Sequence, residues 1–406
     1  MIDAKEVRKD FPFFAKSDLA YLDNSATSQR LQSVLDAEVK FYEENNANPF
    51  RGLYDMSVRA TEAYEDARET VRAFINAKEV GEIIFTRNAS ESLNLVAYSF
   101  GSRFFKEGDE ILVSIEEHHS NMLPWRYAAE RAGATVKYLY VDADGKMTPD
   151  MVKAALTPKT KLFAVTQVSN IMGRTNDIKT FAKICHENGT YLVADGAQSV
   201  PHMPVDVQDL DCDFLAFSGH KMLGPMGIGV LYGKRELLEQ MPPFLSGGEM
   251  IQSVTEDRIT LEELPHKFEA GTVNAAGAVG LAEAMRYIKN IGFADIQERE
   301  NALCTRAYQG MQEIPHVTVL GSDDPNDHHG ILTFKVDNVH PHDIAAIFAS
   351  ENVAVRAGHH CAQPLLLHIG VPNTTRASVM FYNTEEEVDR FLDVLSQIRG
   401  AMGYAD

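Results

Sequence analysis

Apolar positions in the middle of the chain fall into short runs that alternate with helical periodicity. Runs of about five residues, rich in Val, Ile, Leu and Phe, predict strands at 82–86, 111–115, 135–141, 161–168, 191–194, 214–217 and 228–232. Apolar residues at every third or fourth position predict helices between most of them, at 91–105, 122–132, 149–156 and 179–188. This alternation is typical of a largely parallel sheet with helices on both faces.

The last predicted link, from Phe217 to Ile228, breaks this pattern. It spans about ten residues and is rich in Gly and Pro, whereas a parallel crossover needs about a dozen or more, usually including a helix. The strand at 228–232 should therefore run antiparallel to its neighbours. The chain is predicted to form a mixed sheet of roughly seven strands.

The two ends of the chain are organised differently. Before the sheet, the pattern predicts a short helix ending at Pro12, an extended segment at 20–23 and helices at 31–42 and 57–75. After a long helical region at 275–289 and 293–311, strands at 317–320, 331–336 and 353–356 and helices at 342–351 and 385–402 indicate a smaller α+β unit. We predict a large domain at 16–292 and a small one at 293–406, with residues 1–15 packed on the latter.

Composition narrows the classes of function. The 406-residue chain is 45% hydrophobic and 24% charged, as in ordinary soluble proteins. Its formal charge of −20 argues against a nucleic-acid partner, because phosphate binding needs a basic surface. No apolar run is long enough for a membrane span, and the N-terminus lacks the features of a signal peptide. The four scattered cysteines, without a Cys-x-x-Cys pair, predict a reducing, cytoplasmic compartment.

One strand ends in an unusual group of residues. The buried run at 214–217 breaks into Ser218-Gly219-His220 and ends on Lys221. Desolvation at such a place disfavours an ammonium, so the amine can stay neutral and condense with an aldehyde as a Schiff base. Ser218 and His220 would supply donors for a phosphate. The alternative is that Lys221 simply extends from the strand end into solvent.

Polar residues also follow the other strands, and the carboxyl ends of parallel strands form the binding edge of such a sheet. They are Ala89 and Ser90 at a predicted helix N-terminus, Glu117-His118, Ser169-Asn170 and Asp195-Gly196-Ala197-Gln198. Each has an ordinary alternative as a helix cap, turn former or solvated loop. Together with Lys221 they supply an amine, an anion site, a flat imidazole and a carboxylate, which is what pyridoxal phosphate requires.

These motifs, with Phe268-Glu269-Ala270-Gly271-Thr272, resemble the class V aminotransferase superfamily of pyridoxal-phosphate enzymes. Arg356-Ala357-Gly358-His359-His360-Cys361-Ala362 is similar to the group II, SUF-type cysteine desulfurases and their relatives the selenocysteine lyases. The resemblance covers nearly the whole chain, from Phe11-Pro12 to Tyr382-Asn383-Thr384. It implies the α/β architecture of pyridoxal-phosphate fold type I, with helices on both sides of the mixed sheet.

The resemblance also implies roles for single residues. Lys221, His118 and Cys361 would be catalytic, with Lys221 linked to the cofactor and later moving the Cα proton of the substrate. The other implied cofactor ligands are Asp195 at the pyridinium nitrogen, Gln198 at the phenolic oxygen, Ala89, Ser90, Ser218 and His220 around the phosphate, and Asn170. Thr272 would reach the phosphate across a dimer interface, which implies a homodimer. Arg376 would bind the substrate carboxylate, assisted by Asn170, Arg356 and Ser25.

Cys361 is the residue most informative about which reaction the protein catalyses. It follows Arg356, His359 and His360 in a glycine-containing loop, where positive neighbours favour the thiolate. The resemblance implies that it takes sulfur from L-cysteine as a persulfide, releases L-alanine and passes the sulfur to an acceptor of iron–sulfur cluster assembly. Zinc is a competing interpretation, with His359, His360, Cys361 and a histidine from 328–342 as ligands. Adjacent ligands without a second spaced pair form a poor tetrahedral site, so we predict no metal.

Two further alternatives stay open from the sequence. A selenocysteine lyase or another class V relative would need Lys221 and Asp195 but not Cys361. A non-catalytic carrier of sulfur or metal would leave the residues at the strand ends unexplained. The sequence also departs from the family at Phe50, where the family usually has a histidine before the arginine.

Overall fold

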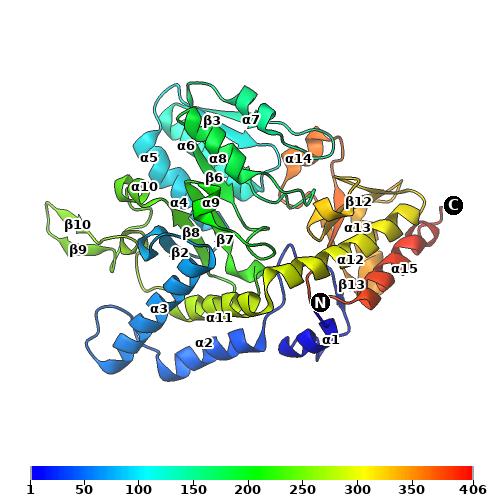
Figure 1. Ribbon diagram of the computed structural model, residues 1–406, viewed down its shortest axis with the longest axis horizontal. Coiled ribbons are helices and arrows are strands. Elements are labelled where there is room, and N and C mark those ends of the chain that lie inside the picture. Colours follow the sequence, from blue (N-terminus) through cyan, green and yellow to red (C-terminus); the bar gives the residue numbers. More distant parts are fainter. Residues whose placement is uncertain (1, 405–406) are drawn as a thin grey trace.

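The computed structural model of the chain describes residues 2–404. Its centre is a seven-stranded sheet with helices on both faces (Figure 1). In spatial order the strands are β2 (Ile83–Thr86), β8 (Gly229–Gly233), β7 (Phe214–Ser218), β6 (Tyr191–Asp195), β5 (Thr160–Thr166), β3 (Glu110–Ser114) and β4 (Thr135–Leu139). Every strand predicted for the sheet is present within a few residues of its predicted bounds.

The direction of β8 also agrees with the prediction. It pairs antiparallel with β7 on one side and with β2 on the other, whereas the remaining neighbours are parallel. Two antiparallel pairings in succession leave β2 running in the same direction as β7. The carboxyl ends of β2, β3, β5, β6 and β7 therefore meet at one edge of the sheet.

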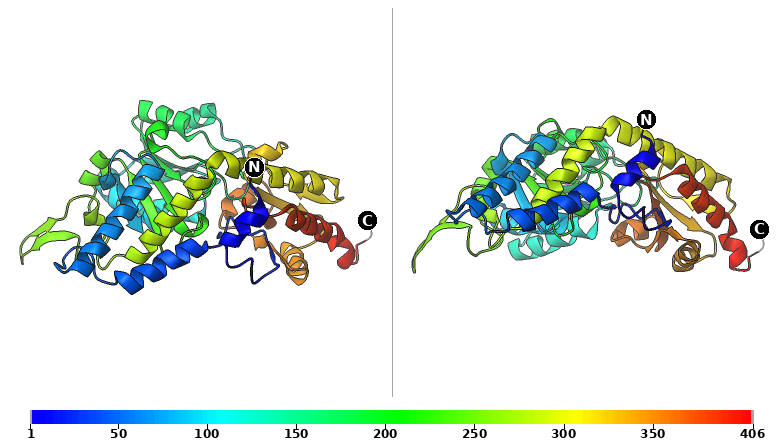
Figure 2. Two further views of the ribbon diagram at one scale, coloured as in Figure 1. Left: turned by 60° about the horizontal axis from the view of Figure 1, so that its bottom comes forward. Right: turned by 90° about the horizontal axis from the view of Figure 1, so that it is seen from below.

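Strand β7 illustrates how the sheet divides the core into two layers. Leu215 and Phe217 pack into one cluster, and Phe214 and Ala216 pack into the other, because successive strand residues point to opposite faces. The first cluster lies under α2 (Gln32–Glu44), α3 (Asp55–Phe74), α8 (Ile178–Glu187) and α11 (Ala275–Ile291). The second lies under α4 (Ala89–Leu95), α6 (Leu123–Ala132) and α10 (Arg235–Gln240), so both faces of the sheet are covered (Figure 2).

Several short elements connect the larger ones. The predicted helix at 91–105 consists of α4, a π-helical segment at Val96–Phe100 and α5 (Gly101–Phe104). The other short elements between residues 80 and 268 are the helices α7 (Pro149–Ala155) and α9 (Val207–Leu210) and the 3₁₀ turns at Val80–Glu82, His119–Asn121, Gly219–Lys221 and His266–Phe268. Over residues 2–404, none of the helices has both the length and the apolar character needed to cross a membrane.

The C-terminal part is an antiparallel sheet covered by helices, as the α+β prediction states. Its strands lie in the order β11 (Val317–Val319), β12 (Ile331–Val336), β15 (Thr374–Ser378) and β14 (Arg356–Gly358). The helices are α12 (Phe293–Glu313), α13 (Pro341–Ser350), α14 (Gln363–His368) and α15 (Glu385–Ala401). The predicted strand at 353–356 is divided between β13 (Val353–Ala354) and β14. Sequence reasoning missed β15, α14, the short helices α9 and α10, and the hairpin of β9 (Ile251–Val254) and β10 (Ile259–Leu261).

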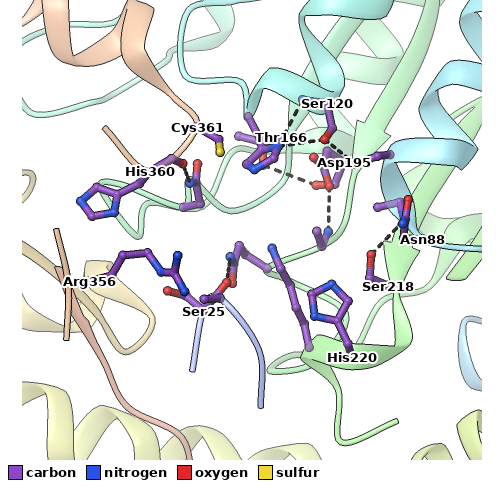
Figure 3. Close-up of a pocket in the computed structure, with 18 of the residues that line it drawn as sticks. Ser25, Asn88, Ser120, Thr166, Asp195, Ser218, His220, Arg356, His360 and Cys361 are labelled. Carbon is purple, nitrogen blue, oxygen red and sulfur yellow. Dashed lines mark hydrogen bonds between the residues drawn. The ribbon is translucent and has the colours of Figure 1, made fainter. Parts of the chain in front are cut away.

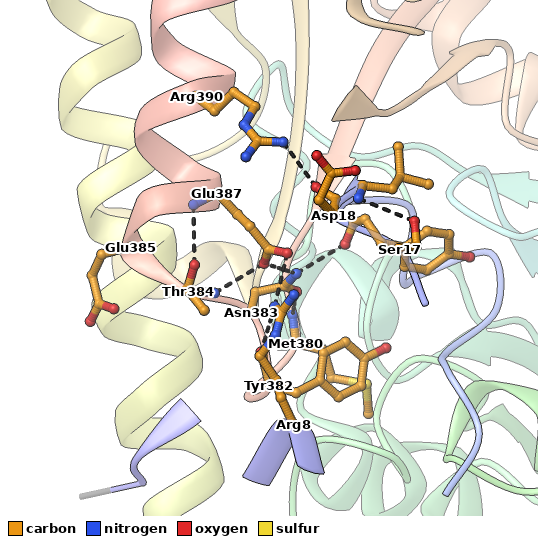
Figure 4. A network of polar contacts seen from close by, with 12 residues as sticks. Arg8, Ser17, Asp18, Met380, Tyr382, Asn383, Thr384, Glu385, Glu387 and Arg390 are labelled. Carbon is orange, nitrogen blue, oxygen red and sulfur yellow. Dashed lines mark hydrogen bonds and ion pairs between the residues drawn. The ribbon is translucent and has the colours of Figure 1, made fainter. Parts of the chain in front are cut away.

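The beginning of the chain is built into this C-terminal part. After α1 (Ala4–Val7) and a 3₁₀ turn at Arg8–Asp10, strand β1 (Ala20–Tyr21) pairs in parallel with β13. Figure 4 shows Arg8 beside Glu387 at the start of α15, where they form an ion pair with an N–O distance of 2.8 Å. Asn383 donates to the other carboxylate oxygen of Glu387. The predicted domain boundary between residues 292 and 293 remains a prediction. Residues 20–21, which were predicted in the large domain, pair with β13 in the C-terminal part.

Candidate active site

A cavity of about 330 Å³ opens at the carboxyl edge of the large sheet, between that edge and the C-terminal part (Figure 3). The predicted site residues that line it are Ser25, Ala89, Ser90, His118, Asn170, Asp195, Gln198, Ser218, His220, Lys221, Arg356, Cys361 and Arg376. Thr272 is the exception, because it lines a separate cavity with Phe85 and Thr86. The structure therefore brings together residues from distant parts of the chain, while their chemical roles remain predictions.

Lys221 and Asp195 lie at the ends of the neighbouring strands β7 and β6. Burial lowers the pKa of Lys221 to about 8, although the nearby carboxylate of Asp195 acts in the opposite direction. Burial likewise raises the pKa of Asp195, whose Oδ1 accepts a hydrogen bond from the Ala197 amide at 2.9 Å. About a tenth of Lys221 is thus neutral at pH 7, far more than for an ordinary lysine, and this fraction is available as a nucleophile.

His118 follows β3 and presents a neutral ring to the cavity. Burial, followed by the charge of Lys221, lowers its pKa to about 3. Its Nδ1 accepts a hydrogen bond from the Ser120 amide at 3.1 Å. Because that bond requires an unprotonated Nδ1, the ring hydrogen lies on Nε2. The buried side chain of Glu117, whose Oε1 accepts a hydrogen bond from the Thr166 amide at 2.7 Å, anchors this loop to the end of β5.

An anion site lies at the end of β2, where helix α4 begins. Asn88 caps the helix by accepting from the Glu91 amide at 3.0 Å. The Ala89 amide donates to Ser218 Oγ at 2.8 Å, and Ser90 Oγ lies 2.5 Å from Ser120 Oγ. Backbone and hydroxyl donors at a helix N-terminus are suited to a phosphate group. His220 completes this side, with a pKa lowered to about 4 mainly by burial.

The opposite side of the cavity carries a buried cation. Arg376 lies on β15 with 3% of its side chain exposed, and it donates from Nη1 to the Asn170 carbonyl at 2.9 Å. Its Nε is buried without a hydrogen-bond partner. Burial lowers the pKa of Arg376 to about 10, which leaves the guanidinium charged at neutral pH. A charged group with an unused donor can bind a carboxylate entering the cavity.

Cys361 lies in a loop with unusual backbone geometry. His360 and Cys361 both adopt left-handed conformations, with φ of 48° and 57°. The loop is held by hydrogen bonds from Asn170 Nδ2 to the His360 carbonyl at 2.8 Å and from the His119 amide to the Cys361 carbonyl at 2.7 Å. Cys361 is exposed, whereas Cys185, Cys212 and Cys304 are buried, as their apolar surroundings predicted.

The histidines of the competing zinc site are dispersed. His328 is buried beside Tyr308 and bonded to the Ser322 carbonyl, while His340 and His342 pack on each other. Within residues 2–404 no group of three or more His, Cys, Asp or Glu side chains is placed to hold a metal ion.

Sequence reasoning missed several residues of the cavity wall, namely Ala26, Asn88, Ser120, Thr166, Ala197 and His360 as a wall residue. Thr166 and Asn88 have a signal that could have been used, because each stands at or just after a strand end. Asp23, whose carboxylate binds Arg356, lies in the predicted extended segment at 20–23 and was assigned no role. Phe50, the departure from the family pattern, has a φ of 77° and packs against Tyr64 and His266.

The set of donors fits pyridoxal phosphate. A buried amine, a buried carboxylate on the next strand, a neutral flat ring and an anion site at a helix start all face one cavity. These match the aldehyde, ring nitrogen, ring face and phosphate of that cofactor.

Comparisons with known proteins agree with this fit. The family model described as "Aminotransferase class-V" matches residues 20–391. A protein from Staphylococcus epidermidis named a probable cysteine desulfurase is 49% identical over 407 aligned positions, covering 99% of this chain and 98% of that protein.

Two solved structures have the same fold. The cysteine desulfurase CsdA from Escherichia coli, an S-sulfonic acid form, has a TM-score of 0.92 at 36% identity, with 99% of both chains covered. The apo cysteine desulfurase from Thermococcus onnurineus NA1 has a TM-score of 0.94 at 41% identity, covering 98% of this chain and 99% of that one.

Proposed function

We propose that, in this chain, Cys361 removes the sulfur of L-cysteine as a persulfide and L-alanine is released. The chain belongs to the class V aminotransferase family and is a pyridoxal-phosphate cysteine desulfurase. The single observation that carries this proposal is the position of Cys361. It is the one exposed cysteine among the described residues, and it lines the cavity that holds Lys221.

Residues of the large sheet would hold the cofactor. Asp195 would pair with its ring nitrogen, His118 would lie on its ring, Gln198 would bind its phenolic oxygen, and Ala89, Ser90, Ser218 and His220 would hold its phosphate. Asn170 would contact it from the end of β5. When bound, pyridoxal phosphate supplies an electron sink for the bonds at the substrate Cα.

Lys221 and Arg376 would act on the two ends of the amino acid. Arg376, assisted by Asn170, Arg356 and Ser25, would fix the carboxylate and so orient the Cα hydrogen towards Lys221. With a pKa of about 8, the Lys221 amine can take up and return a proton at Cα near neutral pH. His118, neutral with its hydrogen on Nε2, would donate a hydrogen bond from that nitrogen into the cavity.

The sulfur step requires a nucleophilic sulfur at the cavity rim. The Cys361 thiolate attacks the substrate sulfur, a sulfur–sulfur bond forms and the Cβ–sulfur bond breaks. The electron pair stays with the carbon, which is protonated to give the methyl group of L-alanine. Because Cys361 is exposed, a thiol of an acceptor protein can then take the outer sulfur by exchange. We place that acceptor in iron–sulfur cluster assembly.

The active form would be a homodimer. Thr272 lies outside the cavity of its own chain, and it lines a separate cavity with residues around the end of β2. This placement supports a role for Thr272 at the phosphate of a second copy.

The test is release of L-alanine and sulfide from L-cysteine with a reductant, comparing the natural protein with Cys361→Ser. We expect equal amounts of both products from the natural protein, and loss of both in the variant while the yellow cofactor band remains. Cys304→Ala, which changes a buried thiol, is the matched control and should stay active. A Cys361→Ser variant with full activity would refute the persulfide and favour direct elimination, as in a selenocysteine lyase.

A further inference from the structure

Arg356 and Arg376 lie on the side of the cavity that would bind the substrate carboxylate, and Asp23 contacts both of them. Asp23 accepts from Nη2 of Arg356 at 2.8 Å and from its Nε at 3.1 and 3.2 Å. Asp23 also lies 3.8 Å from Nη2 of Arg376. The forked contact with Arg356 is the strong, bidentate kind, whereas the longer contact leaves Arg376 largely unpaired. One internal carboxylate thus already occupies one of the two guanidinium groups.

The backbone next to Asp23 is firmly fixed. Asn24 Nδ2 donates to the Ser378 carbonyl at 2.7 Å and to Asn383 Oδ1 at 3.0 Å, and the Tyr382 hydroxyl donates to Asn24 Oδ1. The Ser378 amide donates to the Leu22 carbonyl at 2.7 Å. Both neighbours of Asp23 are therefore bonded to the strand β15 that carries Arg376. The backbone at Asp23 is therefore tied to this strand on both sides.

The net charge around Arg356 and Arg376 follows from the ionisable side chains that lie there. The ring of His360 is neutral, because burial lowers its pKa to about 3, and burial raises the pKa of the Tyr21 phenol to about 12. Within the group of Asp23, Arg356 and Arg376, two guanidinium groups and one carboxylate sum to one positive charge. Cys361 also acts on both arginines, adds a negative charge when it is a thiolate, and is the same in every variant compared below. One incoming carboxylate neutralises this charge, and a second would have no free partner.

We propose that Asp23 is a specificity-determining residue, which occupies Arg356 so that the cavity accepts amino acids with one carboxylate and disfavours those with two. The inference rests on the proposed function, since it places the substrate carboxylate at Arg376. It extends that function to the class of substrate that is rejected, namely dicarboxylates. A purely structural ion pair would tie β14 to the N-terminal segment without changing this preference.

The test compares two ligands that cannot react, butanoate and succinate, which have the same carbon chain and differ by one carboxylate. Their dissociation constants are measured by calorimetry on the cofactor-loaded protein at fixed ionic strength, because salt screens such interactions. The variants are Asp23→Asn, Arg356→Gln and the two combined. Asp323→Asn, at an exposed position on the loop after β11, is the control for a charge change elsewhere.

In the natural protein and in Asp323→Asn we expect succinate to bind no more tightly than butanoate. In Asp23→Asn the freed Arg356 should bind the second carboxylate, and succinate should become tighter than butanoate by about tenfold. The double variant restores a single positive charge and should return the ratio to its natural value. An unchanged ratio in Asp23→Asn, or a tenfold ratio that persists in the double variant, would overturn the proposal.

Arg356→Gln keeps the proposal testable if Asp23→Asn does not fold. Asp23 would then be left with Arg376 alone, and butanoate binding should weaken by about tenfold. Unchanged butanoate affinity in this variant would contradict the proposal that Asp23 acts as counter-ion to both arginines. Neither butanoate nor succinate reacts, so these affinities test the role of Asp23 alone. Failure of the proposed function would show differently, as a natural protein that releases no alanine from L-cysteine.

Discussion

The two walls of the cavity are built in different ways. The wall from the large sheet, which carries Asp195, Ser218 and Lys221, stands at the ends of neighbouring strands. Asp195 is in register with Ala216, and Ser218 with Gly229, so ladder hydrogen bonds fix the backbone at these positions. The wall from the C-terminal part carries Cys361 in a left-handed loop held by single hydrogen bonds to Asn170 and His119.

This difference separates two tasks. The groups that would hold the cofactor gain their geometry from a sheet that is buried on both faces, and changing it requires moving strands. Cys361, which we propose carries the sulfur, gains its geometry from local backbone conformation and a few hydrogen bonds. Substitutions that fill space should therefore affect the first wall, and substitutions that restrict backbone angles should affect the second.

The largest effect is expected from Gly229→Ala. A Cβ atom at this position would lie 2.5 Å from the Cα and 2.7 Å from the carbonyl carbon of Asn88, so the start of α4 must shift. Overpacking of this kind costs about 1–3 kcal/mol, and we expect cofactor affinity to fall by about tenfold or more. Absorbance titration of cofactor-free protein measures it. Gly400→Ala, in open space on α15, is the control, and equal affinity in both variants would contradict the role of packing.

A smaller and different effect is expected from Gly358→Ala. No atom lies within 4 Å of the new Cβ, but the φ of 124° is unfavourable for any residue except glycine. Strain of about 1–3 kcal/mol would displace the following loop, so alanine release should slow by roughly three- to tenfold. Titration should show unchanged cofactor affinity. A loss of cofactor equal to that in Gly229→Ala would remove the distinction between the walls.

The third prediction concerns pH and needs no substitution. Only the neutral amine reacts with acetic anhydride, and burial lowers the pKa of Lys221 to about 8. In cofactor-free protein its acetylation should therefore rise through pH 8. Lys179, whose pKa is raised by Asp209, should react only at higher pH. Mass spectrometry of trace-labelled peptides follows both residues at once, and a common midpoint would show that Lys221 is not desolvated.

The sequence predicted the large sheet well because most of its strands are apolar on both faces; the edge strand β4 instead alternates exposed and partly buried residues. It failed at β15, whose residues Thr374-Thr375-Arg376-Ala377-Ser378 look like a polar loop although all five are buried. On the neighbouring strand β12, Thr333 lies opposite Arg376 and Phe334 lies opposite Thr375, so polar side chains occupy buried positions of this sheet. A pattern based on hydrophobicity cannot find such a strand.

The site was predictable to a similar extent. Residues that directly follow apolar strands, such as Asp195 and Lys221, could be assigned to one edge from topology alone. Arg376 came only from the resemblance. The basic neighbours of Cys361 indicated a thiolate, but nothing in its local pattern indicates where the C-terminal sheet docks. Asp23 was passed over because its importance depends on Arg356, about 330 residues later in the chain.

The pairing of β1 with β13 has a consequence for how the protein is made. Tyr21 leaves the ribosome about 330 residues before its partner Ala354, which at about 5–20 residues per second is a wait of tens of seconds. The large sheet can fold during that interval, but the segment carrying Asp23 and Ser25 has no strand to dock on. The cavity is therefore completed only at the end of translation, and a prematurely terminated chain could contain Lys221 without a finished substrate site.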